Sequence, residues 1–276
     1  MNSSKICRSA VVTMALGRAT ENLDYTFASF AQCSGVELHA FILAEQLPKR
    51  QLPNIQYHLL APSPGFSHPM RELWFRRWQV LDELDVDYAL IVDCFDVLCV
   101  QPLPPLEKLL GGSDVAACVE HGASRYLLGP GYTANYLNAG VVLWNVPRSR
   151  DIRTEVVERG RSHFRTFGDD QFYLNEVIQT KHFERLKILP CQYNFRAYFR
   201  HRQRGWPTVE HLDGVMIYHN ATCIDEAKKI LPVKPHAVLS DLATDGRPLT
   251  SREQFWRRVR HRFGKYGQHY RRFPKY

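Results

Sequence analysis

Two aspartates end an apolar run near residue 90, and this ending constrains the fold more than any other feature of the chain. Residues Tyr88 to Val92 are apolar, and Asp93 and Asp96 follow at once. Such a run predicts a buried, parallel strand that carries carboxylates at its carboxyl end, where open α/β sheets bind ligands. Because neighbouring carboxylates repel and are costly to desolvate without a cation, the pair predicts a divalent metal and a bound diphosphate.

The rest of the chain alternates between strand-like and helix-like segments. We expect strands over residues 8–16, 36–43, 55–60, 88–92, 115–119, 136–145, 186–189 and 215–219. We expect helices over residues 22–33, 70–84, 106–110, 149–160 and 169–179. This alternation predicts an α/β fold with a doubly wound, mixed sheet of Rossmann-like type, flanked by helices.

Composition narrows the classes of protein. No apolar run approaches the ~20 residues of a membrane span, and residues 8–16 follow a short polar start and are expected to form a core strand rather than a secretory signal. The seven cysteines show no Cys-x-x-Cys spacing, and most lie in apolar runs. This usage argues for a reducing compartment and against a disulfide framework or a zinc site. We therefore expect a cytoplasmic protein.

The positive charge is confined to the end of the chain. Residues 251–276 hold nine Lys or Arg and one acid, which gives +8, and the other 27 basic and 27 acidic residues cancel. Apolar residues recur there at near-helical spacing: Phe255, Trp256, Val259, Phe263 and Tyr266. The pattern predicts an anchor at an anionic membrane surface through residues 252–272. A helix packed on the body, or an end without structure, has equal weight, and nucleic-acid binding ranks third because the body is neutral.

Four polar pieces interrupt the apolar pattern. They are Asp93 with Asp96, the stretch Asn138-Ala139-Gly140, the stretch Asp169-Asp170-Gln171, and His219 with Asn220. Alone, most have ordinary explanations: an aspartate at 169 or 170 caps a helix, small residues at 138–140 make a tight turn, and His219 is a core or loop histidine. The acid pair favours function even alone, because capping or turn formation needs one acid and not two.

The order of these pieces resembles that in GT-A glycosyltransferases of the glycogenin and lipopolysaccharide galactosyltransferase type. The matching blocks are "YALIVDCFDVLCVQPLPPLEKLL", "YLNAGVVLWN", "GDDQFYLNEV", "LKILPCQYNF" and "VMIYHN", over roughly residues 8–230. The Asp-x-x-Asp spacing and the segment "AVVTMALGRATEN" are more similar to the glycosyltransferase domain of procollagen lysyl hydroxylases. The resemblance implies a GT-A domain over residues 1–245, with a nucleotide-sugar half over about 8–100 and an acceptor half over 101–230, before a basic tail over 246–276.

The resemblance also implies a cofactor and a reaction. Asp93, Asp96 and His219 would hold Mn²⁺ against the diphosphate of a UDP-sugar. Two carboxylates and an imidazole suit Mn²⁺ better than Mg²⁺, which stays the second choice. The related families retain anomeric configuration, which implies transfer of a hexose, galactose or glucose, to a carbohydrate-type acceptor. The acceptor itself, whether glycan, lipid or protein, is not implied.

Further site residues follow from the same resemblance. Asp170 would bind sugar hydroxyls and Gln171 would lie near the anomeric carbon, as the catalytic pair. The donor would contact Thr13, Met14, Ala15, Arg77, Asp93, Asn138, Ala139, Gly140 and Asp169. Arg77 is preferred to Arg76 because it shares the inward helix face with Leu73 and Val80, and a solvent-exposed arginine is the alternative.

One departure from the family pattern supports a different function. The families have a glycine and then a lysine after the late histidine, whereas this chain reads Asn220-Ala221-Thr222-Cys223, with Lys228 and Lys229 as candidate replacements. The alternative is therefore a catalytically weak or inactive GT-A-fold protein that binds glycans or membranes. A sugar nucleotidyltransferase would need a glycine-rich loop after the first strand, and Gly17-Arg18 is too sparse for that.

Overall fold

The computed structural model describes most of the body of the chain. It covers residues 7–16, 20, 23, 27–63, 69–94, 97–119, 136–163, 169–196, 214–219 and 252. Asp96, residues 120–135 and nearly all of the basic tail lie outside these residues, as does the side chain of Asp169. The predictions made for Asp96, Asp169, Lys228, Lys229 and the tail helix therefore stay predictions.

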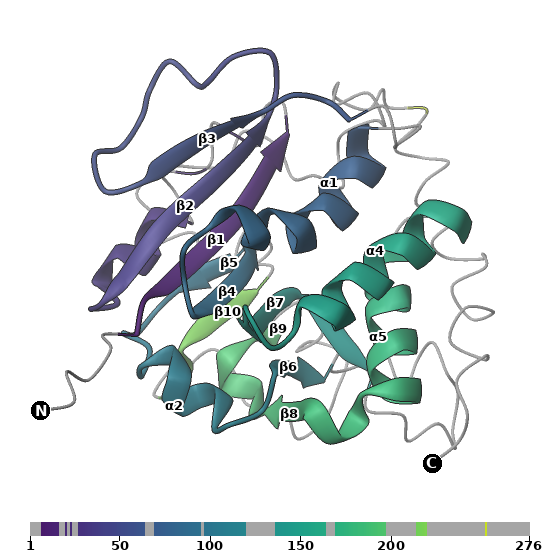
Figure 1. Ribbon diagram of the computed structural model, residues 1–276. Helices are drawn as coiled ribbons and strands as arrows, with labels where there is room; N and C mark the ends of the chain where they lie inside the picture. Colours follow the sequence, from purple (N-terminus) through teal and green to yellow (C-terminus); the bar gives the residue numbers. More distant parts are fainter. Residues whose placement is uncertain are drawn as a thin grey trace, which may run out of the picture.

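A seven-stranded mixed sheet forms the centre of the molecule (Figure 1). Its order is β3-β2-β1-β4-β7-β6-β8. The strands are β1 (Ser9–Leu16), β2 (Val36–Leu43), β3 (Gln56–Leu60), β4 (Tyr88–Asp93), β6 (Val115–Val119), β7 (Leu137–Asn145) and β8 (Leu186–Leu189). This confirms the predicted α/β class and the Rossmann-like mixed sheet, and each predicted strand of this sheet is present within a few residues of its expected bounds.

The direction of β7 brings the second polar piece to the first. β1, β2, β3 and β4 run parallel, whereas β7 runs antiparallel to β4, with Val92 paired to Val141. The amino-terminal end of β7 therefore lies beside the carboxyl-terminal end of β4. As a result, Gly140 lies next to Asp93 at one edge of the sheet.

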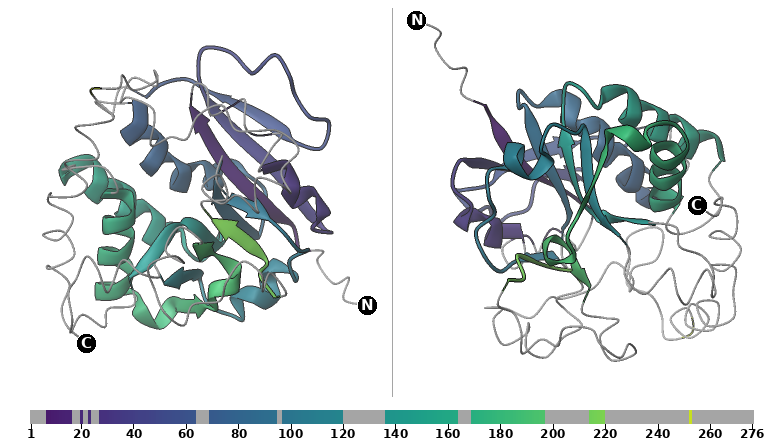
Figure 2. Two further views of the ribbon diagram at one scale, coloured as in Figure 1. Left: turned by 180° about the vertical axis from the view of Figure 1, so that it is seen from behind. Right: turned by 90° about the horizontal axis from the view of Figure 1, so that it is seen from below.

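Helices cover both faces of the sheet (Figures 1 and 2). One face packs against α1 (Pro69–Gln79), α4 (Arg150–His163) and α5 (Asp169–Lys181). The other packs against the 3-10 helix η2 (Phe27–Gln32) and the short α2 (Leu106–Leu110). Since each face of the sheet buries its own apolar cluster, β1 and β4 are buried on both sides. The continuous apolar run of β4 predicts this burial.

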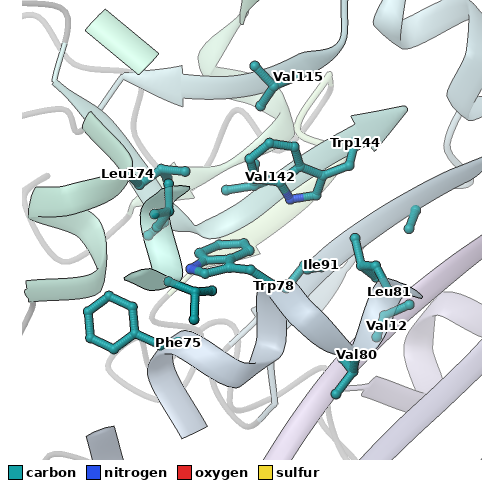
Figure 3. Packing of buried hydrophobic residues seen from close by; sticks show 14 of the residues in the cluster. Val12, Phe75, Trp78, Val80, Leu81, Ile91, Val115, Val142, Trp144 and Leu174 are labelled. Carbon is teal, nitrogen blue, oxygen red and sulfur yellow. The ribbon is translucent and has the colours of Figure 1, made fainter. Parts of the chain in front are cut away.

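Two tryptophans join the sheet to its helical cover. Trp78 of α1 and Trp144 of β7 are fully buried, and their rings meet edge to face with centroids 5.6 Å apart (Figure 3). This arrangement suits the ring quadrupoles. The contact holds α1, which carries Arg77, against the strand that carries Asn138 near its start.

A small second sheet carries the late histidine. It has the order β5-β10-β9, formed by β5 (Val97–Cys99), β10 (Ile217–His219) and β9 (Phe195–Arg196). In the antiparallel pair of β10 with β5, His219 is opposite Val97. Because β5 follows β4 after a break of three residues, this pairing returns His219 to the end of β4. The sequence did not indicate β5 or β9, whose two or three residues are too few for a periodic pattern.

Two predicted helices differ from the structure. Within the expected helix 22–33, residues Phe27–Gln32 form the 3-10 turn η2 rather than an α-helix, although Leu23, Phe27 and Phe30 are buried as expected. The expected helix 70–84 ends at Gln79 and continues as a 3-10 turn, η3 (Val80–Glu83). The tighter turn still buries Val80 and Leu81, so the apolar pattern alone could not distinguish the two.

Two further predictions can be compared with the described residues. The six cysteines among them form no disulfide with one another, and this includes Cys33 and Cys99, whose sulfurs lie 3.6 Å apart. Within the described part of the chain, no helix has the length and apolar character needed to cross a bilayer.

Candidate functional site

Asp93 lies at the centre of a polar cluster at the carboxyl end of β4. Its Oδ1 accepts a hydrogen bond from Nη1 of Arg77 at 2.7 Å. Its Oδ2 faces Nε2 of His219 at 3.6 Å, beyond hydrogen-bond distance. The Asp93 side chain is 31% exposed, whereas His219 is buried. Asp93 therefore connects buried groups to an accessible edge of the sheet.

Arg77 joins this aspartate to the amino-terminal turn of α5. Its Nη2 donates to Oδ2 of Asp170, and its guanidinium carbon lies 4.3 Å from the centre of the Trp78 ring. Arg77 is buried, so the solvent-exposed alternative is excluded. The formal charges of the Asp93, Asp170 and Arg77 side chains sum to −1. A largely buried site with excess negative charge favours binding of a cation.

Gly140 makes room for the two groups that face each other. A Cβ built on this glycine would lie 2.3 Å from Cε1 of His219 and 2.6 Å from Oδ2 of Asp93. Both distances are shorter than the contacts that real Cβ atoms make, so only glycine fits without displacing these groups. The sequence signal of small residues at 138–140 therefore has a local cause, which is the close approach of the backbone to the site.

Asn138 connects the start of β7 to its neighbours. Its Oδ1 accepts hydrogen bonds from the Gly140 N–H at 2.9 Å and from Nδ2 of Asn194 at 2.8 Å. Its Nδ2 lies 3.3 Å from Oε1 of Gln171, which also accepts the Ala139 N–H at 3.0 Å. These bonds place Gln171 and Asn138 side by side. Their predicted roles, catalytic for Gln171 and donor-binding for Asn138, stay predictions.

Asn175 fixes the register between α5 and β7. Its amide donates to the Leu137 carbonyl at 2.9 Å and accepts the Leu137 N–H at 2.6 Å, as a second strand would. It also donates to the backbone carbonyl of Gln171, one turn earlier, at 2.7 Å. The residue is fully buried, so these bonds form in a low-dielectric environment and fix the position of Gln171 over β7.

The residues predicted at the end of β1 lie next to this cluster, but Met14 and Ala15 pack in the apolar clusters on the two faces of the sheet. Met14 is opposite Asp93 in the parallel register, and Thr13 is opposite Val92. The Thr13 hydroxyl donates to the Val92 carbonyl at 2.8 Å, and Thr13, Met14 and Ala15 are all buried. Contact of these three residues with a nucleotide stays a prediction.

The described residues supply part of a metal site. No group of three His, Cys, Asp or Glu residues suited to a metal occurs among the residues whose positions the structure describes, and Asp96, the third predicted ligand, lies outside them. Asp93 and His219 offer one oxygen and one nitrogen that face each other at 3.6 Å. This donor set, beside a glycine that leaves the space open, fits a divalent transition metal such as Mn²⁺.

The overall fold can be compared with that of solved proteins. Two structures of the galactosyltransferase LgtC each align with 82% of this chain and with 98% of their own chain. One is an active-site mutant, with 19% identity and a TM-score of 0.56. The other is a complex with donor and acceptor sugar analogs, with 17% identity and a TM-score of 0.55. Mouse xyloside xylosyltransferase 1, in its apo form, aligns over 76% of this chain and 97% of its own (15% identity, TM-score 0.52).

The chain has the GT-A fold. A third similar protein, the glycosyltransferase GlyE of Streptococcus pneumoniae TIGR4, aligns over 78% of this chain and 54% of its own, with 21% identity and a TM-score of 0.51. No protein-family model and no curated protein sequence matches the chain. The GT-A resemblance inferred from the sequence blocks is thus confirmed at the level of the fold, and the likeness to lysyl hydroxylases stays a prediction.

Two residues of this candidate site were not singled out from the sequence. Asn194 and Asn175 are buried, and both hydrogen-bond to residues that were predicted. Asn175 had a weak signal, because it lies one helical turn after Gln171 among apolar neighbours. Asn194 had none, since an asparagine beside an aromatic residue near a proline is most simply a turn residue.

Proposed function

We propose that this protein is a metal-dependent, retaining glycosyltransferase that uses a UDP-hexose. The transferred sugar would be galactose or glucose, and the acceptor a carbohydrate-type molecule. The observation that carries the proposal is the convergence of Asp93, Gly140, Asp170 and His219, from distant parts of the chain, at one edge of a GT-A sheet. The solved relatives include a galactosyltransferase bound to donor and acceptor sugar analogs.

The charge distribution supports a cation and a diphosphate at this edge. Asp93 and His219, with Asp96 as the predicted third ligand, would hold Mn²⁺, with Mg²⁺ as the second choice. When bound, the metal would act as a Lewis acid that stabilises the negative charge developing on UDP as it leaves.

The protein's own groups would bind and orient the sugar. Arg77 donates to one oxygen each of Asp93 and Asp170 and so orients both carboxylates at the edge of the sheet where the sugar and the metal would bind. Gln171 is oriented by the Ala139 N–H, so its carbonyl dipole has a defined direction before the substrate arrives. In the transfer, the bond from anomeric carbon to phosphate oxygen breaks, the acceptor hydroxyl oxygen bonds to that carbon on the same face, and its proton is released.

Calorimetry with UDP tests the proposal. UDP should bind in the presence of Mn²⁺ and weakly or not at all after chelation. Asp96→Ala should abolish the metal-linked part of binding, because it removes a predicted ligand. Full metal-linked binding by this variant would contradict the metal assignment. Hydrolysis of a panel of UDP-sugars would then identify the donor, before acceptors are screened with it.

A second function is favoured by the sequence after His219. The family's phosphate-binding glycine and lysine are missing there, which supports a GT-A-fold protein that binds a glycan or a membrane without turnover. The two proposals differ in the same experiment. Metal-linked UDP binding followed by hydrolysis of a UDP-sugar supports the enzyme, whereas binding of a glycan without any UDP binding supports the alternative.

We also propose that the basic end of the chain docks on an anionic membrane surface. The support is the charge count, since the excess of +8 lies wholly in residues 251–276. Each Lys or Arg near an anionic leaflet contributes about 1 kcal/mol, so several together suffice for reversible binding. A peripheral enzyme of this kind would act on acceptors held at that surface.

A further inference from the structure

His219 has a hydrogen-bond partner on the side of its ring that faces away from Asp93. Its Nδ1 lies 2.9 Å from Oδ1 of Asn194, and both residues are buried. Asn194 ends the short turn η5 (Cys191–Tyr193) and directly precedes β9, which pairs with β10. The contact is therefore built by the second sheet, between residues far apart in the sequence.

A backbone group decides which end of the Asn194 amide faces the histidine. The N–H of Gly140 can only donate, so the Asn138 atom that receives it at 2.9 Å must be the oxygen, Oδ1. That oxygen can only accept, so the Asn194 atom 2.8 Å from it must be the NH₂ group. The oxygen of Asn194 is then the atom next to Nδ1 of His219.

The same reasoning determines the proton on the ring. An amide oxygen can only accept a hydrogen bond, so Nδ1 of His219 must carry the proton that it donates to the Asn194 oxygen. In a neutral imidazole the other nitrogen then has a lone pair. That nitrogen, Nε2, is the one that faces Oδ2 of Asp93 at 3.6 Å, in the space kept open by Gly140.

We propose that Asn194 is a positioning residue that holds the proton of His219 on Nδ1 and so presents the Nε2 lone pair to a divalent cation beside Asp93. The cation itself rests on the proposed function. Without Asn194, Nδ1 loses its acceptor, and the negatively charged carboxylate of Asp93, 3.6 Å from Nε2, favours the proton on Nε2, where it blocks coordination. Histidine ligands commonly have such a partner on their second nitrogen, which orients the ring and selects its tautomer.

The first test reads the proton position in metal-free protein, with no dependence on activity. Long-range ¹H–¹⁵N spectra of the histidine rings, assigned through backbone connectivities, are recorded at alkaline pH, where an imidazole is neutral. Wild-type His219 should show a protonated Nδ1 and an unprotonated Nε2. A proton on Nε2 would overturn the proposal, and this result needs no variant.

Variants of Asn194 provide the second test. Asn194→Ala should move the proton to Nε2, and Asn194→Asp, which keeps an acceptor next to Nδ1, should leave it on Nδ1. Asn145→Ala is a matched control, because the side chain of Asn145 accepts the Arg148 N–H at the opposite end of β7 from the site. An unchanged tautomer in Asn194→Ala would contradict the role assigned to Asn194.

A titration with Mn²⁺ in the presence of UDP, in which electron paramagnetic resonance measures the free ion, tests the role of Asn194 and the proposed metal function separately. Asn194→Ala should weaken Mn²⁺ binding about 10–100-fold relative to wild type, Asn194→Asp and Asn145→Ala about threefold or less. If the tautomer changes as expected but wild type binds no Mn²⁺, the proposed metal function is overturned and the effect of Asn194 on the proton stands. If Mn²⁺ binds equally well to Asn194→Ala, the positioning role is overturned and the metal function stands.

Discussion

At the scale of single residues, the site is organised by a few groups that can only donate hydrogen bonds. Two backbone N–H groups, of Ala139 and Gly140, orient the amides of Gln171 and Asn138. One guanidinium, of Arg77, is shared between two acids. Because a donor cannot become an acceptor, these few groups determine the direction of the whole network.

Arg77→Met should destabilise the protein. The change leaves the carboxylate of Asp170, whose side chain is 9% exposed, without its cation. The loss of a buried partner of this kind costs about 3 kcal/mol, as chemical denaturation would measure. Arg150→Met is the control: its arginine is 67% exposed and pairs with Asp82 at the surface, so its loss should cost about 0.5 kcal/mol or less. Equal effects of the two changes would contradict the bridging role of Arg77.

Gly140→Ala should damage the site more than the fold. The new Cβ displaces the Asp93 carboxylate and the His219 ring, so we expect metal-linked UDP binding to fall about tenfold or more in calorimetry. Val142→Ala, two residues along β7 in the core, should cost about 2 kcal/mol of stability and leave UDP binding unchanged. Similar UDP binding by the Gly140 variant and wild type would show that the space beside Gly140 is not needed.

At the scale of elements, the site depends on how β7 meets its neighbours. The antiparallel pairing with β4 sets Gly140 beside Asp93, and the amide of Asn175 sets α5 on Leu137. The second sheet then brings His219 to the same edge by pairing β10 with β5. Each of these contacts joins segments that the sequence separates.

Asn175→Leu should loosen α5 from β7. The change leaves the Leu137 N–H and C=O, both buried, without the partners that Asn175 supplies. We expect a loss of about 3 kcal/mol in unfolding free energy and faster hydrogen exchange at Leu137. Asn145→Ala, at the more exposed end of β7, should cost about 0.5 kcal/mol. A variant at 175 as stable as wild type would refute this view of the α5–β7 contact.

The β2–β3 edge should make stability depend on pH. Burial lowers the pKa of both His39 and His58, whose ordinary value is 6.5, and the rings share a hydrogen bond of 2.9 Å between Nδ1 and Nε2. Because the unfolded chain then binds more protons, stability is full above the unfolded pKa and falls as pH drops through it. Thermal unfolding between about pH 7.5 and 5.5 should show this loss.

His58→Phe is the matched variant for this effect. It keeps an aromatic ring stacked on Phe41, 4.4 Å away between centroids, but removes one titrating group. The pH dependence of its melting temperature should be shallower than that of wild type. A slope equal to that of wild type would assign the dependence to other groups.

At the scale of the whole molecule, charge and chemistry are segregated. The body, with its GT-A sheet, is electrically neutral, and the excess charge lies beyond it in sequence. This division predicts that membrane docking and donor binding can be changed separately.

Removing part of the positive charge of the tail should weaken vesicle binding without affecting UDP binding. We expect the protein to co-sediment with vesicles containing anionic lipid at low salt, and less at high salt because the attraction is screened. Replacement of Arg257, Arg258, Arg260 and Arg262 by Gln should lower this binding and leave UDP binding as it is. If the variant co-sediments as well as wild type, these arginines do not mediate the contact with the membrane, or that contact is not electrostatic.

The sequence by itself determined the layers of this protein and the first member of its site. Largely apolar segments predicted β1, β2, β4 and β7, because a strand buried on both faces has mostly apolar side chains. Asp93 could be singled out from the sequence because a carboxylate directly after an apolar run breaks the apolar pattern of a buried strand. The preference for Arg77 over Arg76 followed from helical periodicity, and the burial of Arg77 agrees with it.

Only the tertiary structure decided how these pieces face one another. The roles of Asn194 and Asn175 depend on pairings between segments about 25 and 38 residues apart, and an isolated asparagine carries no mark of its distant partner. The strands β5 and β9 are too short to show a period, yet they return His219 to Asp93. The spacing of residue types along the chain predicts the structure of a single helix or strand. The hydrogen bonds between elements depend on how those elements pack, which the spacing does not specify.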